Sequence, residues 1–251
     1  MTFTMDIQRY VRPNADGSFA LVRSEYANFD ALLPSFTAID KLKNAYEATG
    51  KSFNGFTWYP TVYTTEYQVA QPQYLFYSGG TLWDGTRASS KYKQLFSKLD
   101  QTGYFRVCGV VDKWQHTPNS AIGLIPIDGK SLIAAIHKAG ISLVLHTQGH
   151  IESGAPTARI FEAAAANAVI IADRHPFIQQ NFGNNVLYID TEKSAENIFQ
   201  QIDQHMQWIY AHPKEAQAKA INCHDIFMQK FSLDAQLLKL LEMHQHITQV
   251  I

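Results

Sequence analysis

Arg159 and Glu162 stand three residues apart in the segment SGAPTARIFEAAAANAVIIAD, residues 153 to 173. Side chains at this spacing are neighbours on one face of a helix, so they form either an intrahelical salt bridge or part of a binding site. In a binding site, the arginine suits a phosphate and the glutamate can accept hydrogen bonds from two sugar hydroxyls. Pro156 fits the first turn of such a helix, and the N–H of Thr157 would then face an anion.

These residues need a framework that holds them at one edge of a sheet. From about residue 73 onward, short apolar runs alternate with longer helical patterns, which predicts α/β units around a parallel sheet. Ligands bind at the carboxyl ends of the strands in such sheets, so the loop before the helix of Glu162 lies at the ligand edge. The expected strands are 74–77, 105–111, 141–146, 168–172 and 186–189, and the expected helices are 88–98, 130–138, 157–166 and 194–210.

The two ends of the chain differ from this pattern. Residues 19–26 predict a strand, residues 31–49 a helix interrupted at Pro34, and residues 53–67 an aromatic, β-branched stretch that contains a proline. Two helical patterns follow Pro213. The second has leucines at helical spacing, which predict a buried face, and these are Leu233, Leu237, Leu240 and Leu241.

Composition narrows the class of protein. The 251 residues, 46% of them hydrophobic, suit one large or two modest globular domains. A formal net charge of −1 gives no global field for nucleic acid or an anionic membrane. Cys108 and Cys223 lie far apart without metal-ligand spacing, which predicts reduced thiols in a cytoplasmic protein. The sequence has no run of about eighteen apolar residues and no signal core, so we expect neither a membrane-spanning helix nor a secretion signal.

Other residues at the predicted ligand edge could also contact a ligand. After the first strand of the sheet, Gly79 and Gly80 would permit close backbone approach and Arg87 would supply charge, although a Gly-Gly pair also forms an ordinary tight turn. His146 and His150 follow a later strand, where an imidazole either bonds a sugar hydroxyl or phosphate or has a structural role.

Several segments in order resemble the C-terminal domain of GT-B fold glycosyltransferases, in the branch that includes spore-maturation-type proteins. They are Arg-Ile-Phe-Glu-Ala-Ala-Ala, Val-Ile-Ile-Ala-Asp, Pro-Phe-Ile and Phe-Gly-Asn-Asn-Val-Leu-Tyr-Ile-Asp, within roughly residues 72 to 210. The resemblance implies a Rossmann-like parallel sheet, flanked by helices, that holds a nucleotide diphosphate sugar. It further implies that Glu162 binds the ribose, that the loop ending at Arg87 contacts the diphosphate, and that backbone groups near Ile125 pair with the nucleobase.

The sequence departs from the family in two ways. Many retaining members have a second glutamate eight residues before the ribose-binding one, where this chain has Gly154. The nearest carboxylate, Glu152, either replaces it or is a solvated loop residue. In addition, only about seventy residues precede the donor domain, fewer than the N-terminal domain of these enzymes has. We therefore expect either a shortened enzyme, or a cleft completed by a partner chain or a second copy of this chain.

The sequence thus predicts a glycosyltransferase that moves a sugar from a nucleotide diphosphate sugar to an unknown acceptor, without a metal or other cofactor. His146 and Glu152 are the candidate catalytic residues. The candidate donor-binding residues are Gly79, Gly80, Arg87, Ile125, His150, Thr157, Arg159 and Glu162. Two alternatives remain: a non-catalytic nucleotide-sugar-binding protein or subunit that needs a partner chain, and a nucleotide-sugar epimerase, which would need no acceptor.

The predicted organisation has three parts. Residues 1–71 form a partial N-terminal α/β region and linker, and residues 72–212 form the nucleotide-sugar-binding domain. Residues 213–251 form C-terminal helices that pack back on the N-terminal region.

Overall fold

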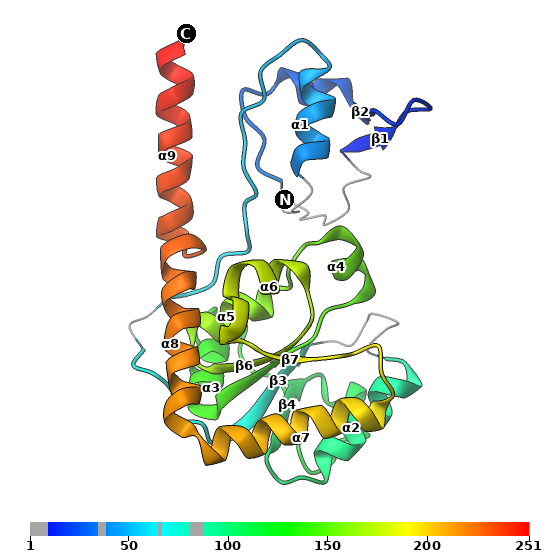
Figure 1. Cartoon of the computed structure of the whole chain (residues 1–251), viewed down its shortest axis with the longest axis vertical. Coiled ribbons are helices and arrows are strands. Elements are labelled where there is room, and N and C mark those ends of the chain that lie inside the picture. The colour runs from blue at the N-terminus through cyan, green and yellow to red at the C-terminus, as the bar shows by residue number, and fades with distance from the viewer. Residues whose placement is uncertain (1–9, 35–38, 65–66, 81–87, 251) are drawn as a thin grey trace.

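A five-stranded parallel sheet with helices on both faces forms the larger part of the protein (Figure 1). The computed structural model describes residues 10–34, 39–64, 67–80 and 88–250. The strands are β1 (Val11–Pro13), β2 (Phe19–Leu21), β3 (Tyr74–Gly80), β4 (Phe105–Gly109), β5 (Gly140–Val144), β6 (Val169–Asp173) and β7 (Leu187–Ile189). The α-helices are α1 (Ile39–Glu47), α2 (Ser90–Asp100), α3 (Ser131–Ala139), α4 (Gln148–Ser153), α5 (Ala158–Ala165), α6 (Pro176–Phe182), α7 (Ala195–Ala211), α8 (Pro213–Lys230) and α9 (Leu233–Val250).

The order of the strands fixes where a ligand can bind. The large sheet has the order β4-β3-β5-β6-β7, and each neighbouring pair is parallel. β4 pairs with one edge of β3, and the next strand of the chain, β5, pairs with the opposite edge of β3. The connections that leave β3 and β5 therefore diverge, which opens a crevice at the carboxyl ends of these two strands.

Alternating side chains of the strands fill two cores. Leu75 and Tyr77 of β3 belong to the core that α2 and α7 cover, whereas Phe76 belongs to the core beneath α3. Val169 and Ile171 of β6 also belong to the core that α2 and α7 cover. Each fully buried large apolar side chain contributes about 1.5–3 kcal/mol. The five predicted strands and the four predicted helices of this domain are present, and the predicted Rossmann-like α/β class is confirmed.

The N-terminal region forms a small unit of its own. β1 and β2 pair antiparallel, with Val11 opposite Leu21, and α1 packs on them through Leu42 and Ala45. The strand predicted over 19–26 ends at Leu21 because a 3₁₀ helix, Ser24–Asn28, follows it. The helix predicted over 31–49 covers only the span of α1 within the described residues.

The aromatic stretch that follows is a linker, not a strand. Among its described residues it forms only an isolated bridge, at Gly55. Phe53 packs on the small N-terminal unit, whereas Tyr59 and Val62 contact the sheet domain. The ring of Tyr59 lies 5.1–5.7 Å from those of Phe161, Phe177 and Phe231, measured between centroids. The backbone N–H of Tyr59 also donates to the side chain of Gln236 in α9, at 2.7 Å. The linker is thereby fixed to the sheet domain and to the last helix.

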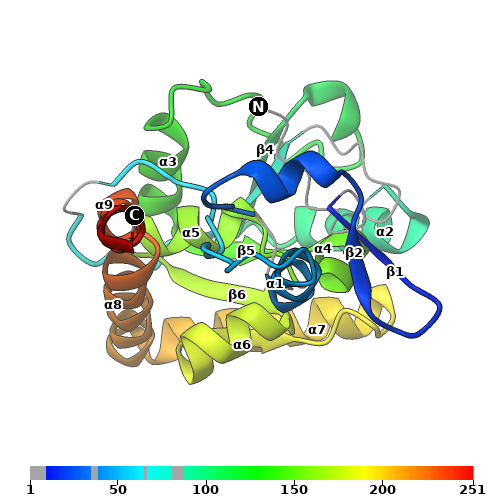
Figure 2. The same ribbon diagram turned by 90° about the horizontal axis from the view of Figure 1, so that it is seen from above.

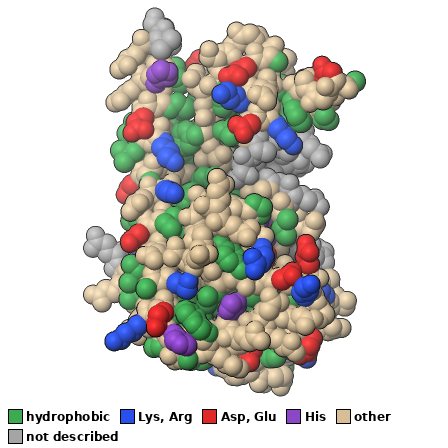
Figure 3. All heavy atoms as spheres, in the orientation of Figure 1, with side chains coloured by type: hydrophobic (Ala, Val, Ile, Leu, Met, Phe, Trp, Pro, Cys, Tyr) green, Lys and Arg blue, Asp and Glu red, His purple; other side chains and the backbone are tan. Residues whose placement is uncertain are grey.

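The two C-terminal helices make different contacts. α8 packs on the sheet domain through Cys223 and Phe227, whereas α9 extends away from it, and Figure 2 shows α9 end-on at the margin of the molecule. The prediction that the leucines of α9 form a buried face is wrong, because Leu237 and Leu241 are 40% and 56% exposed. Hydrophobic and charged side chains are mixed along α9 in Figure 3.

Candidate functional site

A pocket lies at the carboxyl ends of β3 and β4, next to the position where the sheet order reverses. It has a volume of about 340 Å³, and one of its walls is the linker segment 61–63. Beside Thr61 and Tyr63 of the linker, its polar or polarisable lining residues are Ser78 near the end of β3, Cys108 near the end of β4, and Glu162 of α5. The rest of the lining is mainly apolar and includes Leu124, Ile125, Pro126, Ile127, Leu132 and Ile133. A pocket of this size, apolar with few polar groups, suits part of a small ligand.

Glu162 brings a buried carboxyl group to this pocket. Its Oε2 is buried and has no hydrogen-bond partner among the described residues. Burial raises the pKa of Glu162, and the positive charge of Arg159 partly offsets this rise. Within the described part of the chain, Arg159 forms no ion pair with Glu162, so the simple intrahelical salt bridge is not present. A buried acceptor without a donor is what a hydroxyl-bearing ligand would satisfy.

Arg159 is oriented by the sheet. Its Nε donates to the carbonyl oxygen of Ser78 at 2.5 Å, and its Nη1 donates to Thr157 Oγ1 at 3.2 Å. These bonds hold the guanidinium between the end of β3 and the start of α5. Thr157 is the N-cap residue of α5, but its side chain does not cap the helix. The N–H of Ile160 donates to the carbonyl oxygen of Thr157, so the N–H groups of Ala158 and Arg159 are the ones that form a positive region with the guanidinium.

Pro156 does not lie in the first turn of α5, where the sequence predicted it. The backbone of Thr157 is extended, with φ −70° and ψ 150°, so the helix begins at Ala158 and the proline precedes the cap. The N–H groups that face outward from the helix start are therefore those of residues 158 onward.

The glycines after β3 differ in their surroundings. A Cβ on Gly79 would lie 2.0 Å from the ring of Trp114, so this glycine makes room for a buried indole. That contact is sufficient to require a glycine at this position. Gly80 ends β3 and pairs with Gly109 of β4. Arg87, which the sequence predicted as a diphosphate contact, lies outside the described residues.

Ile125 lies in the pocket wall, in the same pocket as Glu162. Residues 122–130 form an irregular loop, in which the side chain of Asp128 accepts a hydrogen bond from the backbone N–H of Ser131 at the start of α3. No backbone hydrogen bond of Ile125 occurs within the described parts of the chain. Its N–H and C=O remain available to pair with a planar polar group.

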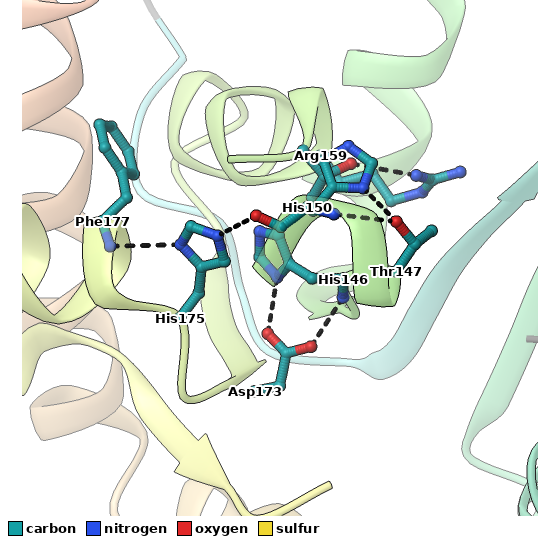
Figure 4. A network of polar contacts seen from close by, with 8 residues as sticks. His146, Thr147, His150, Arg159, Asp173, His175 and Phe177 are labelled. Carbon is teal, nitrogen blue, oxygen red and sulfur yellow. Dashed lines mark hydrogen bonds and ion pairs between the residues drawn. The ribbon is translucent and has the colours of Figure 1, made fainter. Parts of the chain in front are cut away.

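The histidines form a network beside the pocket, at the ends of β5 and β6 (Figure 4). The side chain of His146, which was predicted as a catalytic residue, is 0% exposed, and His146 is not among the residues that line the pocket. His150 lies in α4, and its Nδ1 is 2.6 Å from Thr147 Oγ1. The backbone of Glu152 also belongs to α4.

Sequence reasoning did not identify several residues of the site. Thr61, Val62 and Tyr63 line the pocket although they belong to the N-terminal part of the chain. Asp173 binds His146, but its position after an apolar strand gave no sign of that pairing. Cys108 was interpreted only as a reduced thiol; it lies in the pocket wall, where burial raises its pKa.

The described residues also limit two other roles. They hold no cluster of three His, Cys, Asp or Glu side chains arranged to bind a metal ion. In the same ranges, no helix is long and apolar enough to cross a membrane.

The parallel sheet and the pocket at the carboxyl ends of its strands identify this part of the protein as a Rossmann-like domain with a ligand crevice. A family model described as "Glycosyl transferase-like" matches residues 87–242. The chain belongs to this glycosyl transferase-like family. No curated protein sequence matches the chain.

Solved structures support the same fold. The pneumococcal O-GlcNAc transferase GtfA, solved with UDP and GlcNAc, is similar with a TM-score of 0.57 and 12% identity, over 96% of this chain and 51% of that one. A glycosyltransferase from Rickettsia africae ESF-5 gives 0.57 and 15%, over 90% and 68%. The GtfA/B complex gives 0.59 and 9%, over 95% and 51%. This chain therefore spans about half the length of two of these three proteins. The fold of this chain is therefore similar to that of GT-B glycosyltransferase domains.

Proposed function

We propose that this chain binds a nucleotide diphosphate sugar in the pocket between β3, β4, α5 and the linker, and that it serves transfer of the sugar to an acceptor. The observation that carries the proposal is the buried carboxyl of Glu162, whose Oε2 has no partner among the described residues and which lines the pocket at the reversal of the sheet order. A carboxylate can accept hydrogen bonds from two vicinal hydroxyls of a ribose at once.

The remaining groups suit the other parts of such a donor. The nucleobase would lie against the apolar wall and pair with the unbonded backbone of Ile125. The diphosphate would lie at the N-terminus of α5, near Arg159 and the N–H groups beside Thr157. Negative charge grows on the departing diphosphate during sugar transfer, and these fixed donors would stabilise it without a metal ion. Gly80, Arg87 and His150 remain proposed contacts of the donor.

The acceptor side of the site is not part of this proposal. Glu152 remains a candidate catalytic carboxylate on α4, and the sugar, the acceptor and a cytoplasmic location remain predictions from the sequence. A second candidate function is a donor-binding subunit that a partner chain completes. It is favoured because one of the similar solved structures, GtfA/B, is itself a complex.

The first experiment is calorimetric titration of the purified chain with a panel of nucleoside diphosphates and their sugars. We expect selective binding that is lost in Glu162→Ala. The matched control is Glu192→Ala, which removes an exposed glutamate on the loop before α7. Equal binding by parent and Glu162→Ala would refute the site.

A second measurement distinguishes the two functions. An enzyme would release the nucleotide from its donor sugar, by transfer or by slow hydrolysis, whereas a donor-binding subunit would bind the donor without turnover until its partner is added. Conversion of the donor sugar to an epimer without any acceptor would instead support the epimerase alternative.

A further inference from the structure

Next to the proposed nucleotide-sugar site, the buried carboxyl group of Asp173 contacts two nitrogens of His146, the backbone N and the ring Nδ1. Asp173 is the last residue of β6, and its Oδ2 accepts a hydrogen bond from the backbone N–H of His146 at 2.7 Å. Its Oδ1 lies 2.6 Å from His146 Nδ1 (Figure 4). An ionised carboxylate can only accept hydrogen bonds, so Nδ1 must carry a proton. Both side chains are almost completely buried, and the orientation of the imidazole is fixed.

A second histidine, His175, contacts both His146 and His150. The ring of His175 stacks on that of His146, with 4.3 Å between centroids and 25° between planes. Its Nδ1 accepts from the backbone N–H of Phe177, so its Nε2 carries the proton and donates to the carbonyl oxygen of His150 at 3.2 Å. Burial, and then the neighbouring His146, lower the pKa of His175, so the ring is neutral.

These contacts tie one connection of the sheet to its neighbour. His146 begins the connection from β5 to α5, two residues after the strand ends, and His150 lies in the middle of it. Asp173 and His175 both lie at the end of β6. The connection that leads to the N-terminus of α5 is therefore anchored at its start and at its midpoint.

The polar contacts between Asp173, His146 and His175 are better suited to fixing the orientation of these side chains than to stabilising the folded protein. A buried pair of polar side chains can often be replaced by apolar ones of the same shape without loss of stability, so it is a poor means of filling a core. Its distinctive property is that it accepts only one arrangement of donors and acceptors. His146 Nε2 is buried and has no partner among the described residues, so the hydrogen bond that fixes the imidazole is the one to Asp173.

We propose that Asp173 is a positioning residue of the donor site: through His146 it fixes the connection that places the N-terminus of α5, with Thr157 and Arg159, for the diphosphate. This inference rests on the proposed function. It assigns no contact between Asp173 and the substrate.

The first test needs no substrate. Nitrogen-15 NMR of the parent protein should show His146 with a protonated Nδ1, assigned by the signals lost in His146→Asn. An unprotonated Nδ1 would overturn the inference.

The second test measures affinity for the nucleoside diphosphate that binds the parent most tightly in the panel. In Asp173→Asn, the side-chain NH₂ must face one of the two N–H groups of His146, and we expect the dissociation constant to rise by about tenfold, as for the loss of one hydrogen bond to a charged group. The matched control is Asp203→Asn on α7, which alters a carboxylate that binds Tyr104 instead. It should bind like the parent.

A pair of variants at His146 keeps the test valid if Asp173→Asn does not fold. Asparagine places an N–H near the position of Nδ1, whereas glutamine places it near the position of Nε2. We expect His146→Asn to stay within about threefold of the parent affinity and His146→Gln to lose about tenfold. The reverse order would overturn the inference, because Nε2 would then be the group that matters.

The two proposals can fail separately. If the parent binds nucleotide and folded Asp173→Asn binds equally well, the role of Asp173 is refuted and the donor site stands. If the parent binds no nucleoside diphosphate, the proposed function fails, and the role of Asp173 in it fails as well.

Discussion

Replacing Glu162 by glutamine should make the protein more stable and its nucleotide binding weaker. A buried acceptor without a partner costs about 1–3 kcal/mol, and more when it is charged. Glutamine removes the charge at nearly constant volume, so we expect a gain of about 1 kcal/mol near neutral pH. For a chain of this size, that corresponds to a rise in Tm of about 2–4 °C.

The pH dependence of this gain follows from the raised pKa of Glu162. The unfolded chain ionises the carboxyl at its ordinary pKa, and the folded chain ionises it only at higher pH. The folded state therefore loses stability relative to the unfolded state as pH rises between these two values. Glutamine does not titrate, so the Tm of Glu162→Gln should exceed that of the parent by more at about pH 8 than at about pH 5.

The assay is thermal unfolding at both pH values, with calorimetric titration of the same samples. The amide loses the charge-assisted bonds to the ribose, so affinity should fall by about tenfold while Tm rises. Glu192→Gln is the control, because its carboxyl is exposed, and it should change neither quantity. A lower Tm in Glu162→Gln, or an equal shift at both pH values, would refute the reasoning about the buried carboxyl.

Three further predictions concern other parts of the structure. Arg159→Lys cannot reproduce both hydrogen bonds of the guanidinium, so titration should show nucleoside diphosphate affinity lowered by about tenfold; unchanged affinity would contradict the phosphate role. Gly79→Ala forces a methyl group into Trp114 and should cost about 1–3 kcal/mol in chemical denaturation, whereas Gly149→Ala meets no atom closer than 3.8 Å and should cost nothing. Leu241→Ser removes an exposed side chain and should change stability by less than about 0.5 kcal/mol; a larger loss would mean that α9 is covered in solution.

The strands of the sheet domain could be predicted from the sequence because helices cover the sheet on both faces. A run such as Val169–Ile171, apolar at every position, is typical of a strand buried in a parallel sheet, and all three residues are buried. The start of α5 was less predictable. The sequence predicted a helix from residue 157 with Pro156 in its first turn, but the extended backbone of Thr157 delays the start to Ala158, and such local choices are not visible in residue types.

The site was predictable only where a motif lay within one segment. Glu162 and Arg159 belong to one helix, so their spacing was informative. Tyr63 and Ile125 meet in the pocket from separate parts of the chain, and no periodicity relates them. The buried leucine face of α9 was predicted from spacing alone, and spacing tells which residues share a face but not what covers that face.

The linker fixed by Tyr59 affects how the protein can be divided for expression. Tyr59 is bonded to Gln236, 177 residues later, and the pocket wall begins two residues beyond Tyr59. The predicted boundary between residues 71 and 72 therefore separates the pocket from one of its walls. A fragment comprising only residues 72–212 would lack that wall and the helix that holds it, and its aromatic residues Phe161 and Phe177 would lose the ring that covers them. The smallest fragment that retains the whole pocket must start before Tyr59 and continue past Gln236.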